Sequence, residues 1–267
     1  MCLPILRSVL VAWLLAAVAV ASAACGVLGP GGLSEEPSGA EAPPDLIRYV
    51  ALGDSIAVGT GSDTSYVEEY AAWLEAETGS TVRTTNHAGN GWTASDLLHL
   101  VRTDEAIRTS VAEAHVITIN AGGNDLLRAL GEAATGGCGG VDGQECLRAA
   151  VSGFEASWDD LLAELVEVTD GDLRGVRTMD IYRPAFMAQL GPLTPLLQGY
   201  LDAANGHLVA GAEEVGVPVA GVHRAFRDAA GGERSLISTD RLHPNADGHA
   251  AIARELAVFG AGFRDVS

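Results

Sequence analysis

The pattern of hydrophobic and polar positions divides the chain beyond residue 45 into short β-rich runs separated by longer amphipathic segments. Short apolar runs rich in β-branched residues are typical of strands, and apolar residues that recur every three or four positions are typical of helices. We predict strands at residues 46–52, 81–86, 115–120, 175–182 and 217–222. We predict helices at residues 66–77, from 93 or 95 to about 101 with more helix toward 114, and at 145–168, 193–215 and 246–259.

Strands that alternate with helices predict an α/β fold. Right-handed crossovers then place the strands in one parallel sheet that is covered by helices on both faces. A chain of 267 residues with 48% hydrophobic content can bury one substantial core, so we assign residues 46–267 to a single domain. Functional groups in such sheets gather in the crevice outside the carboxyl ends of the strands.

Residues 1–24 have the pattern of a secretory signal. The apolar run at residues 9–21 is too short to be assigned as a membrane-spanning helix, and small residues follow it. Cleavage can fall after Ala21-Ser22-Ala23 or immediately before Cys25. The second site resembles that of a bacterial lipoprotein, except that Ser22 stands where an aliphatic residue is more usual.

The spacing of the cysteines adds to this prediction. Cys138 and Cys146 bracket a Gly-rich stretch and predict a local disulfide, which forms in an oxidising compartment; C-x7-C without a second pair does not have zinc-site spacing. Cys25 is left unpaired at the start of a Gly/Pro/Ser/Glu-rich tether, residues 25–45. We therefore predict lipid on Cys25 and a protein on the outer face of the bacterial cell membrane, with plain secretion as the alternative.

The charge balance limits the classes of partner that the protein is expected to bind. Sixteen basic residues, all of them arginine, stand against thirty-five acidic residues and give a net charge of -19. Such a surface disfavours nucleic acid and anionic membrane surfaces. We expect a solvated, soluble surface, no nucleic-acid partner and a monomer.

Four short motifs carry the candidate chemistry. Gly53-Asp54-Ser55 follows the first predicted strand, the segment 86–91 follows the second, and Gly122-Gly123-Asn124-Asp125 follows the third. Asp240-Arg241-Leu242-His243 lies in the loop that enters the last predicted helix. Three of the four therefore fall at the edge of the sheet where functional groups are expected.

These motifs resemble, in their order, the signature blocks of SGNH hydrolases of the GDSL type, and the resemblance covers residues 48–257. It implies a three-layer α/β/α sandwich with a five-stranded parallel sheet of flavodoxin-like type, and the hydrolysis of carboxylic esters. Residues 53–55 match the block that bears the nucleophile, and residues 89–93 match the block whose glycine donates a backbone N–H. Residues 122–125 match the block with the oxyanion asparagine, and residues 240–244 the block with the acid and base.

The chemistry of these residues fits a serine esterase. A serine hydroxyl needs a base to accept its proton during attack, and imidazole serves near neutral pH, so Ser55 and His243 are the candidate nucleophile and base. Asp240 would orient the imidazole and stabilise its charged form. The N–H groups of Ser55 and Gly91 and the side-chain amide of Asn124 would stabilise the oxyanion. This mechanism requires no metal and no cofactor.

Other readings compete with this assignment. An α/β-hydrolase carries its serine in G-x-S-x-G, but Ala57 stands at the last position of that motif. A metallophosphoesterase needs several Asp and His ligands, yet Asp54 is followed by Ser55, and Gly-Asn by Asp125 rather than by His. Ser55 can also serve as a helix cap. The alternative from another class is a non-catalytic surface binding module, although none of the reacting residues is missing.

The remaining polar candidates are assigned structural roles. We expect Asp125 to hydrogen-bond neighbouring loops or to cap the following helix. We expect His87 to be structural and His249 to pack or to face solvent. The other histidines have no motif around them, and Gly89 is expected to permit a tight turn.

Two segments, 126–146 and 184–197, are expected to decide the substrate. The second carries six large apolar side chains, namely Phe186, Met187, Leu190, Leu193, Leu196 and Leu197. If they line the crevice they favour an acyl chain, and the alternative is that they form the buried stripe of a helix. Aromatic residues make up only 5% of the chain, which speaks against a broad sugar-stacking surface. We predict short- to medium-chain acyl esters or lipids as substrates, with carbohydrate O-acetyl esters of the cell envelope second.

Overall fold

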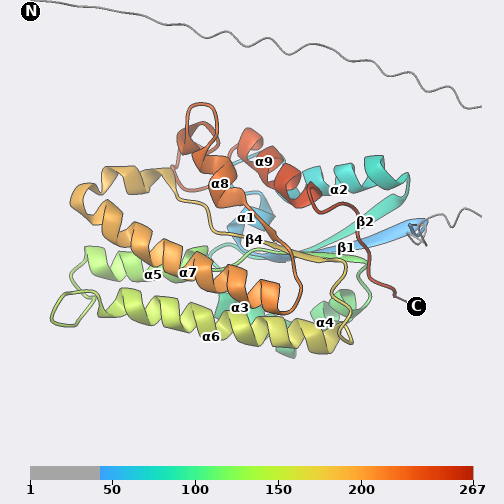
Figure 1. The fold of residues 1–267 in the computed structure, drawn as a ribbon, viewed down its shortest axis with the longest axis horizontal. Helices are drawn as coiled ribbons and strands as arrows, with labels where there is room; N and C mark the ends of the chain where they lie inside the picture. Colours follow the sequence, from blue (N-terminus) through green and yellow to red (C-terminus); the bar gives the residue numbers. More distant parts are fainter. Residues whose placement is uncertain (1–42, 267) are drawn as a thin grey trace, which may run out of the picture. The chain divides into compact units, whose positions relative to one another are not determined.

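The computed structural model describes residues 43–266, so the predicted signal (1–24), Cys25 and nearly all of the tether (25–45) lie outside the described residues. In the described part, five parallel strands form one sheet in the order β2-β1-β3-β4-β5 (Figure 1). The strands are β1 (Leu46–Gly53), β2 (Thr81–Ala88), β3 (Val116–Ile119), β4 (Val176–Met179) and β5 (Val219–Ala220). This order is that of the flavodoxin-like fold, which confirms the predicted fold class.

Helices cover both faces of the sheet (Figure 1). One face packs against α3 (Ala94–Thr103), α4 (Glu105–Ala112), α6 (Glu145–Val168) and α7 (Thr194–Glu214). The other face packs against α1 (Ser55–Val58), α2 (Tyr66–Thr78), α8 (Val222–Arg227) and α9 (Ala246–Ala257). The helix α5 (Gly123–Ala134) packs against α6.

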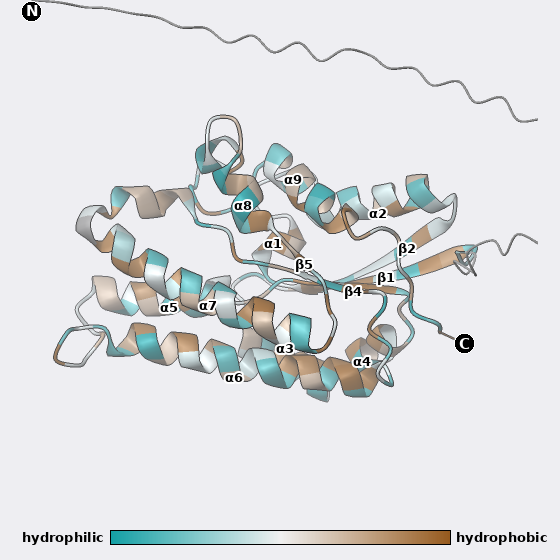
Figure 2. Cartoon of the chain, viewed as in Figure 1, coloured by the Kyte–Doolittle hydropathy of each residue, from teal (hydrophilic) through white to brown (hydrophobic). Residues whose placement is uncertain are grey.

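The strand β1 contributes to both cores because its side chains alternate between the two faces of the sheet. Val50 and Leu52 pack among α3, α6 and α7, whereas Ile47, Tyr49 and Ala51 pack among α2 and α9. All five are buried, as expected of a strand inside a parallel sheet. Along α6 and α7, by contrast, hydrophobic and hydrophilic residues alternate, because only one side of each helix faces the core (Figure 2).

Most of the predicted elements are confirmed, and three segments differ. Residues 126–134, the first part of the segment 126–146, belong to α5, although we predicted no helix there. The predicted strand at 217–222 is reduced to the two residues of β5, because α8 begins at Val222. The stretch 184–193 forms two short 3-10 helices, η1 (Ala185–Gln189) and η2 (Gly191–Leu193), ahead of α7.

The glycines around α5 explain why this helix was not predicted from the sequence. Gly122 is the N-cap of this helix with φ of +97°, a backbone conformation that favours glycine, and it makes no side-chain cap. A Cβ at Gly122 would lie 2.7 Å from side-chain atoms of Ile181 and Phe154. The glycines that usually mark a loop here permit a close approach between the start of α5 and its neighbours.

A third, smaller core lies beside the two main ones. It joins α5, α6, η1 and α7 through Ala129, Leu147, Met187 and Leu197, and it includes the buried Cys138. The predicted disulfide between Cys138 and Cys146 is confirmed, and it closes the loop between α5 and α6. In the chain-entropy account, a disulfide that closes so short a loop stabilises the fold by about 2–3 kcal/mol.

Candidate active site

The four sequence motifs meet at the carboxyl edge of the sheet. Ser55 begins α1 directly after β1, and Asn124 lies in the first turn of α5, just after β3. His243 lies in the loop that precedes α9, whose N-cap is Asn245. The imidazole of His243 nevertheless reaches Ser55, which is 188 residues away in sequence.

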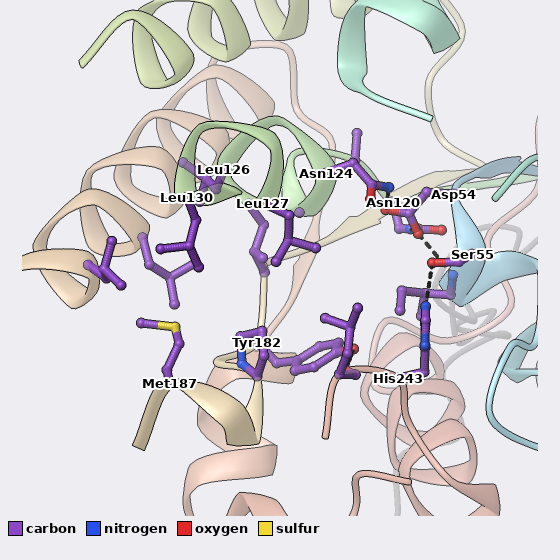
Figure 3. Close-up of a pocket in the computed structure, with 18 of the residues that line it drawn as sticks. Asp54, Ser55, Asn120, Asn124, Leu126, Leu127, Leu130, Tyr182, Met187 and His243 are labelled. Carbon is purple, nitrogen blue, oxygen red and sulfur yellow. Dashed lines mark hydrogen bonds between the residues drawn. The ribbon is translucent and has the colours of Figure 1, made fainter. Parts of the chain in front are cut away.

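A chain of two hydrogen bonds joins the three predicted catalytic side chains, and Figure 3 shows the one between Ser55 and His243. The Nδ1 atom of His243 lies 2.6 Å from Oδ2 of Asp240, and its Nε2 atom lies 3.0 Å from Oγ of Ser55. A carboxylate can only accept, so in the neutral imidazole Nδ1 carries the proton and Nε2 is free to accept from the serine hydroxyl. The geometry is therefore that of a hydroxyl ready to lose its proton to a base.

The turn at residues 238–243 keeps Asp240 ionised. Its Oδ1 atom accepts hydrogen bonds from the Ser238 hydroxyl (2.7 Å) and from the backbone N–H groups of Leu242 (2.9 Å) and His243 (3.0 Å). Partial burial opposes ionisation, but these bonds and the one from the His243 ring together hold the pKa of Asp240 well below its usual range. Asp240 is thus a carboxylate at any pH at which His243 can act as a base.

Asp54 organises the other side of the serine. It is buried and is the N-cap of α1, accepting from the backbone N–H of Ile56 at 2.9 Å. Its carboxylate also accepts from the side-chain amides of Asn120 (2.7 Å) and Asn124 (3.2 Å). The capping role that we weighed for Ser55 therefore belongs to its neighbour. Burial raises the pKa of Asp54 to about 6, although the bonds from Ile56 and Asn120 act in the opposite direction.

The structure brings Asn124 and the Gly91 loop together. The Nδ2 atom of Asn124 donates to the carbonyl of Trp92 at 2.9 Å as well as to Asp54. Both hydrogen bonds come from the side-chain amide of Asn124. An oxyanion formed beside Ser55 would share one of these N–H groups or displace its present acceptor. The bond to Asp54 is the longer of the two. Gly91 has φ of +77°, and its carbonyl accepts from Arg128 at 2.8 Å. Its role as an oxyanion donor stays a prediction.

Several secondary residues also have clear places. Asp125 accepts from the backbone N–H of Ala94 at 3.1 Å and so joins the start of α5 to that of α3. His87 is half-buried and bonds to Ser110 at 2.7 Å, as expected of a structural residue. His249 is fully buried and accepts from the backbone N–H of Tyr66, so it packs inside rather than facing solvent.

Two residues that bear on the site were missed by sequence reasoning. Asn120 is buried at the end of β3 and links Asp54 to the hydroxyl of Tyr66. The signal available was an asparagine that ends an apolar strand at the functional edge of the sheet. Tyr182 donates from its hydroxyl to a backbone carbonyl in the histidine loop, and nothing in the sequence marks that contact.

A pocket extends from the Ser55–His243 pair and is mostly apolar. Figure 3 shows Leu126, Leu127, Leu130 and Met187 at the end of the pocket that lies away from the serine. Both segments that we expected to decide the substrate therefore contribute. Of the six apolar side chains predicted in 184–197, the three that line the pocket are Phe186, Met187 and Leu197. Leu193 is half-exposed.

Between residues 43 and 266, no group of three or more His, Cys, Asp or Glu side chains could hold a metal ion. In the same part of the chain, no helix is long and apolar enough to span a bilayer.

The flavodoxin-like parallel sheet and the serine–histidine–aspartate arrangement at its edge define the class of protein, a serine hydrolase. Residues 51–251 match the GDSL-like Lipase/Acylhydrolase family, and the chain belongs to this family. It is accordingly a carboxylic ester hydrolase.

Individual relatives agree with this assignment. The spore germination lipase LipC of Bacillus licheniformis is 27% identical over 221 residues, which are 81% of this chain and 97% of that one. The structure of the lipase Lip_vut3 from a goat rumen metagenome matches with a TM-score of 0.69 and 26% identity, over 81% of this chain and 98% of that one. The acetylxylan esterase Axe2 of Geobacillus stearothermophilus shares the fold, with a TM-score of 0.56 and 20% identity, over 80% of this chain and 93% of that one.

The raised pKa of Asp54 makes its contribution to stability depend on pH. Between about pH 4 and 6 the folded protein binds a proton at this carboxyl that the unfolded chain does not, so the contribution is full below pH 3.8 and is lost as the pH rises through 6. Burial lowers the pKa of His249 to about 4, which acts in the opposite sense over an overlapping window. The pH dependence of the free energy of unfolding of the wild type therefore does not show the contribution of Asp54 by itself.

Asp54→Asn isolates this contribution, because His249 is present in both proteins. We expect the free energy of unfolding of the wild type, minus that of the variant, to fall by about 2.5 kcal/mol between pH 4 and pH 7. Urea denaturation of both proteins at pH 4, 5, 6 and 7 measures it. A difference that stays constant, or that grows with pH, would contradict the raised pKa.

Proposed function

We propose that this protein hydrolyses short- to medium-chain acyl esters through an acyl-enzyme intermediate on Ser55. The observation that carries this proposal is the apolar pocket that begins at the Ser55–His243 pair. A nucleophile at the polar end of an otherwise apolar pocket favours an ester whose acyl chain extends away from the reacting carbonyl.

The arrangement supports both halves of the reaction. As the Ser55 oxygen attacks the ester carbonyl, its proton passes to Nε2 of His243, and Asp240 stabilises the imidazolium through Nδ1. The tetrahedral oxyanion would receive hydrogen bonds from the Asn124 amide and from the N–H groups of Ser55 and Gly91. His243 then returns the proton to the departing alcohol. In the second half, water attacks the acyl-serine, His243 accepts the water proton, and the same proton returns to Ser55 as the acid leaves.

The lining of the pocket favours an acyl chain over an acetylated sugar. Its far end is built from leucines of α5 and from Met187, whose side chains offer a sugar hydroxyl no donor and, in the methionine sulfur, only a weak acceptor. An acetyl group would leave this apolar end unfilled, whereas several methylene groups would cover it and each would contribute about 0.8 kcal/mol. A carbohydrate O-acetylesterase is the second candidate, and the likeness to an acetylxylan esterase supports it at the level of the fold.

Hydrolysis of a p-nitrophenyl ester series from acetyl to palmitoyl tests the proposal, using protein that begins at Gly26. We expect a maximum between butanoyl and decanoyl and no effect of a chelator. Ser55→Ala should lower kcat by at least about 10³-fold on every ester, because the nucleophile is gone. Ser95→Ala, at an exposed position of α3, is the matched control and should match the wild type. Activity that survives in Ser55→Ala would refute the assigned nucleophile, and a maximum at acetyl would favour the acetylesterase.

Filling the far end of the pocket tests where the acyl chain lies. Leu130→Phe should lower kcat/KM for octanoyl relative to acetyl esters by about 10-fold or more, because the larger side chain occupies the space of terminal methylene groups. Leu193→Phe, on the half-exposed Leu193 outside the pocket lining, is the control and should leave the ratio unchanged. Equal chain-length profiles for the two variants would show that the chain binds elsewhere.

We also propose that the protein is exported and carries lipid on Cys25. The signal pattern of residues 1–24 and the unpaired Cys25 support this, and so does the Cys138–Cys146 disulfide, a bond that persists in oxidising compartments. Mass spectrometry of the mature N-terminus in cells of the producing bacterium is expected to find a diacylglyceryl Cys25. An unmodified N-terminus at Ala24 would establish plain secretion instead.

A further inference from the structure

One segment serves as both a wall of the pocket and the support of the histidine loop. This segment, residues 180–190, follows β4 and contributes Tyr182, Phe186 and Met187 to the pocket. Tyr182 and Phe186 also contact the loop that carries Asp240 and His243. The backbone N–H of Phe186 donates to the carbonyl of Arg241 at 3.2 Å.

Tyr182 makes the contact nearest to the reacting groups. Its hydroxyl donates to the backbone carbonyl of Leu242 at 2.6 Å. That carbonyl belongs to the peptide group that joins Leu242 to His243, so its position constrains where the histidine backbone begins. Since Arg241 is a non-glycine residue with φ of +67°, the loop needs such support to keep its conformation.

The Tyr182 side chain is itself held firmly. It is buried, and its ring stacks on that of Phe226 with centroids 4.6 Å apart. Burial raises the pKa of the Tyr182 hydroxyl well above its usual range, so this group remains a donor at working pH. In Figure 3 the ring lies between Met187 and His243, which places it between the apolar end of the pocket and the base.

We propose that Tyr182 is a positioning residue, which aligns the His243 imidazole with Ser55 by fixing the Leu242 carbonyl. This inference rests on the proposed function, in which His243 is the base. The hydrogen bond between Nε2 and Oγ is 3.0 Å long and links groups on opposite ends of the chain, so it depends on how well the loop is held. A displacement of about 1 Å between reacting groups can cost about 10²-fold in rate.

Tyr182→Phe removes the hydroxyl and retains the ring that lines the pocket. We expect kcat to fall by about 10-fold on every chain length while KM stays within about 2-fold, because acyl-chain contacts remain and alignment is lost. The acid limb of the kcat–pH profile should shift, since the histidine is no longer fixed against its partners. Labelling of Ser55 by a fluorophosphonate probe should slow by a similar factor.

Tyr49→Phe is the matched control. Tyr49 is also buried and its hydroxyl bonds to the Thr118 hydroxyl at 2.8 Å, but this bond lies within the core, away from the pocket lining and the histidine loop. This variant should keep the wild-type kcat, pH profile and labelling rate. If Tyr182→Phe matches the wild type, if both variants lose kcat equally, or if only KM rises, Tyr182 has no positioning role.

A milder variant covers the case in which Tyr182→Phe does not fold. Gln189 accepts a 2.5 Å hydrogen bond from the Arg241 side chain, a second contact between segment 180–190 and the loop. Gln189→Ala should also lower kcat, but by a smaller factor than Tyr182→Phe. If Tyr182→Phe does not fold, an unchanged kcat in Gln189→Ala would overturn the proposal. Failure of the proposed function gives a different result, because ester hydrolysis by the wild type would then be absent or would survive in Ser55→Ala.

Discussion

The candidate site depends on one buried carboxylate at the end of β1. Asp54 accepts hydrogen bonds from the start of α1, from Asn120 after β3 and from Asn124 on α5, and so ties together segments that the chain order keeps apart. A buried carboxylate is stable only when such donors surround it, and each of these donors is fixed by an element that the sheet positions. Gly53 is required beside it, because a Cβ there would lie 2.0 Å from the Asn120 side chain.

The other half of the site comes from the far end of the sequence and relies on a different set of contacts. Asp240 and His243 lie in a turn whose own backbone N–H groups hold the carboxylate, and Ile237 and Pro244 close it with an isolated β-bridge. Hydrogen bonds from Tyr182 and Phe186 join the turn to segment 180–190. The reactive hydroxyl and its base are thus positioned independently, one by the central strand and one by the wall of the pocket.

The sequence predicted those parts of the site that repeat a regular pattern. The alternation of strands and helices predicted the order of the elements, and the carboxyl ends of the strands predicted where the site lies. The spacing of Asp240 and His243 predicted the base and its partner. The helix α5 was missed because its glycines resemble a loop, although Gly122 serves a close approach. The hydrogen bond from Tyr182 to Leu242 could not be predicted from the sequence, because its acceptor is a backbone carbonyl and every residue carries one. Packing decided the pocket, where Met187 lines the wall and Leu193 does not.

The central claim is that Ser55, His243 and the Asn124 amide act on one reacting centre. The most direct measurement is a crystal structure of the protein after reaction with a p-nitrophenyl alkylphosphonate. We expect phosphorus bonded to the Ser55 oxygen, the phosphoryl oxygen within about 3 Å of the Asn124 Nδ2 and Gly91 backbone nitrogen atoms, and the alkyl chain among the α5 leucines. A phosphonate on another residue, or one whose oxygen faces away from the Asn124 amide, would contradict the account.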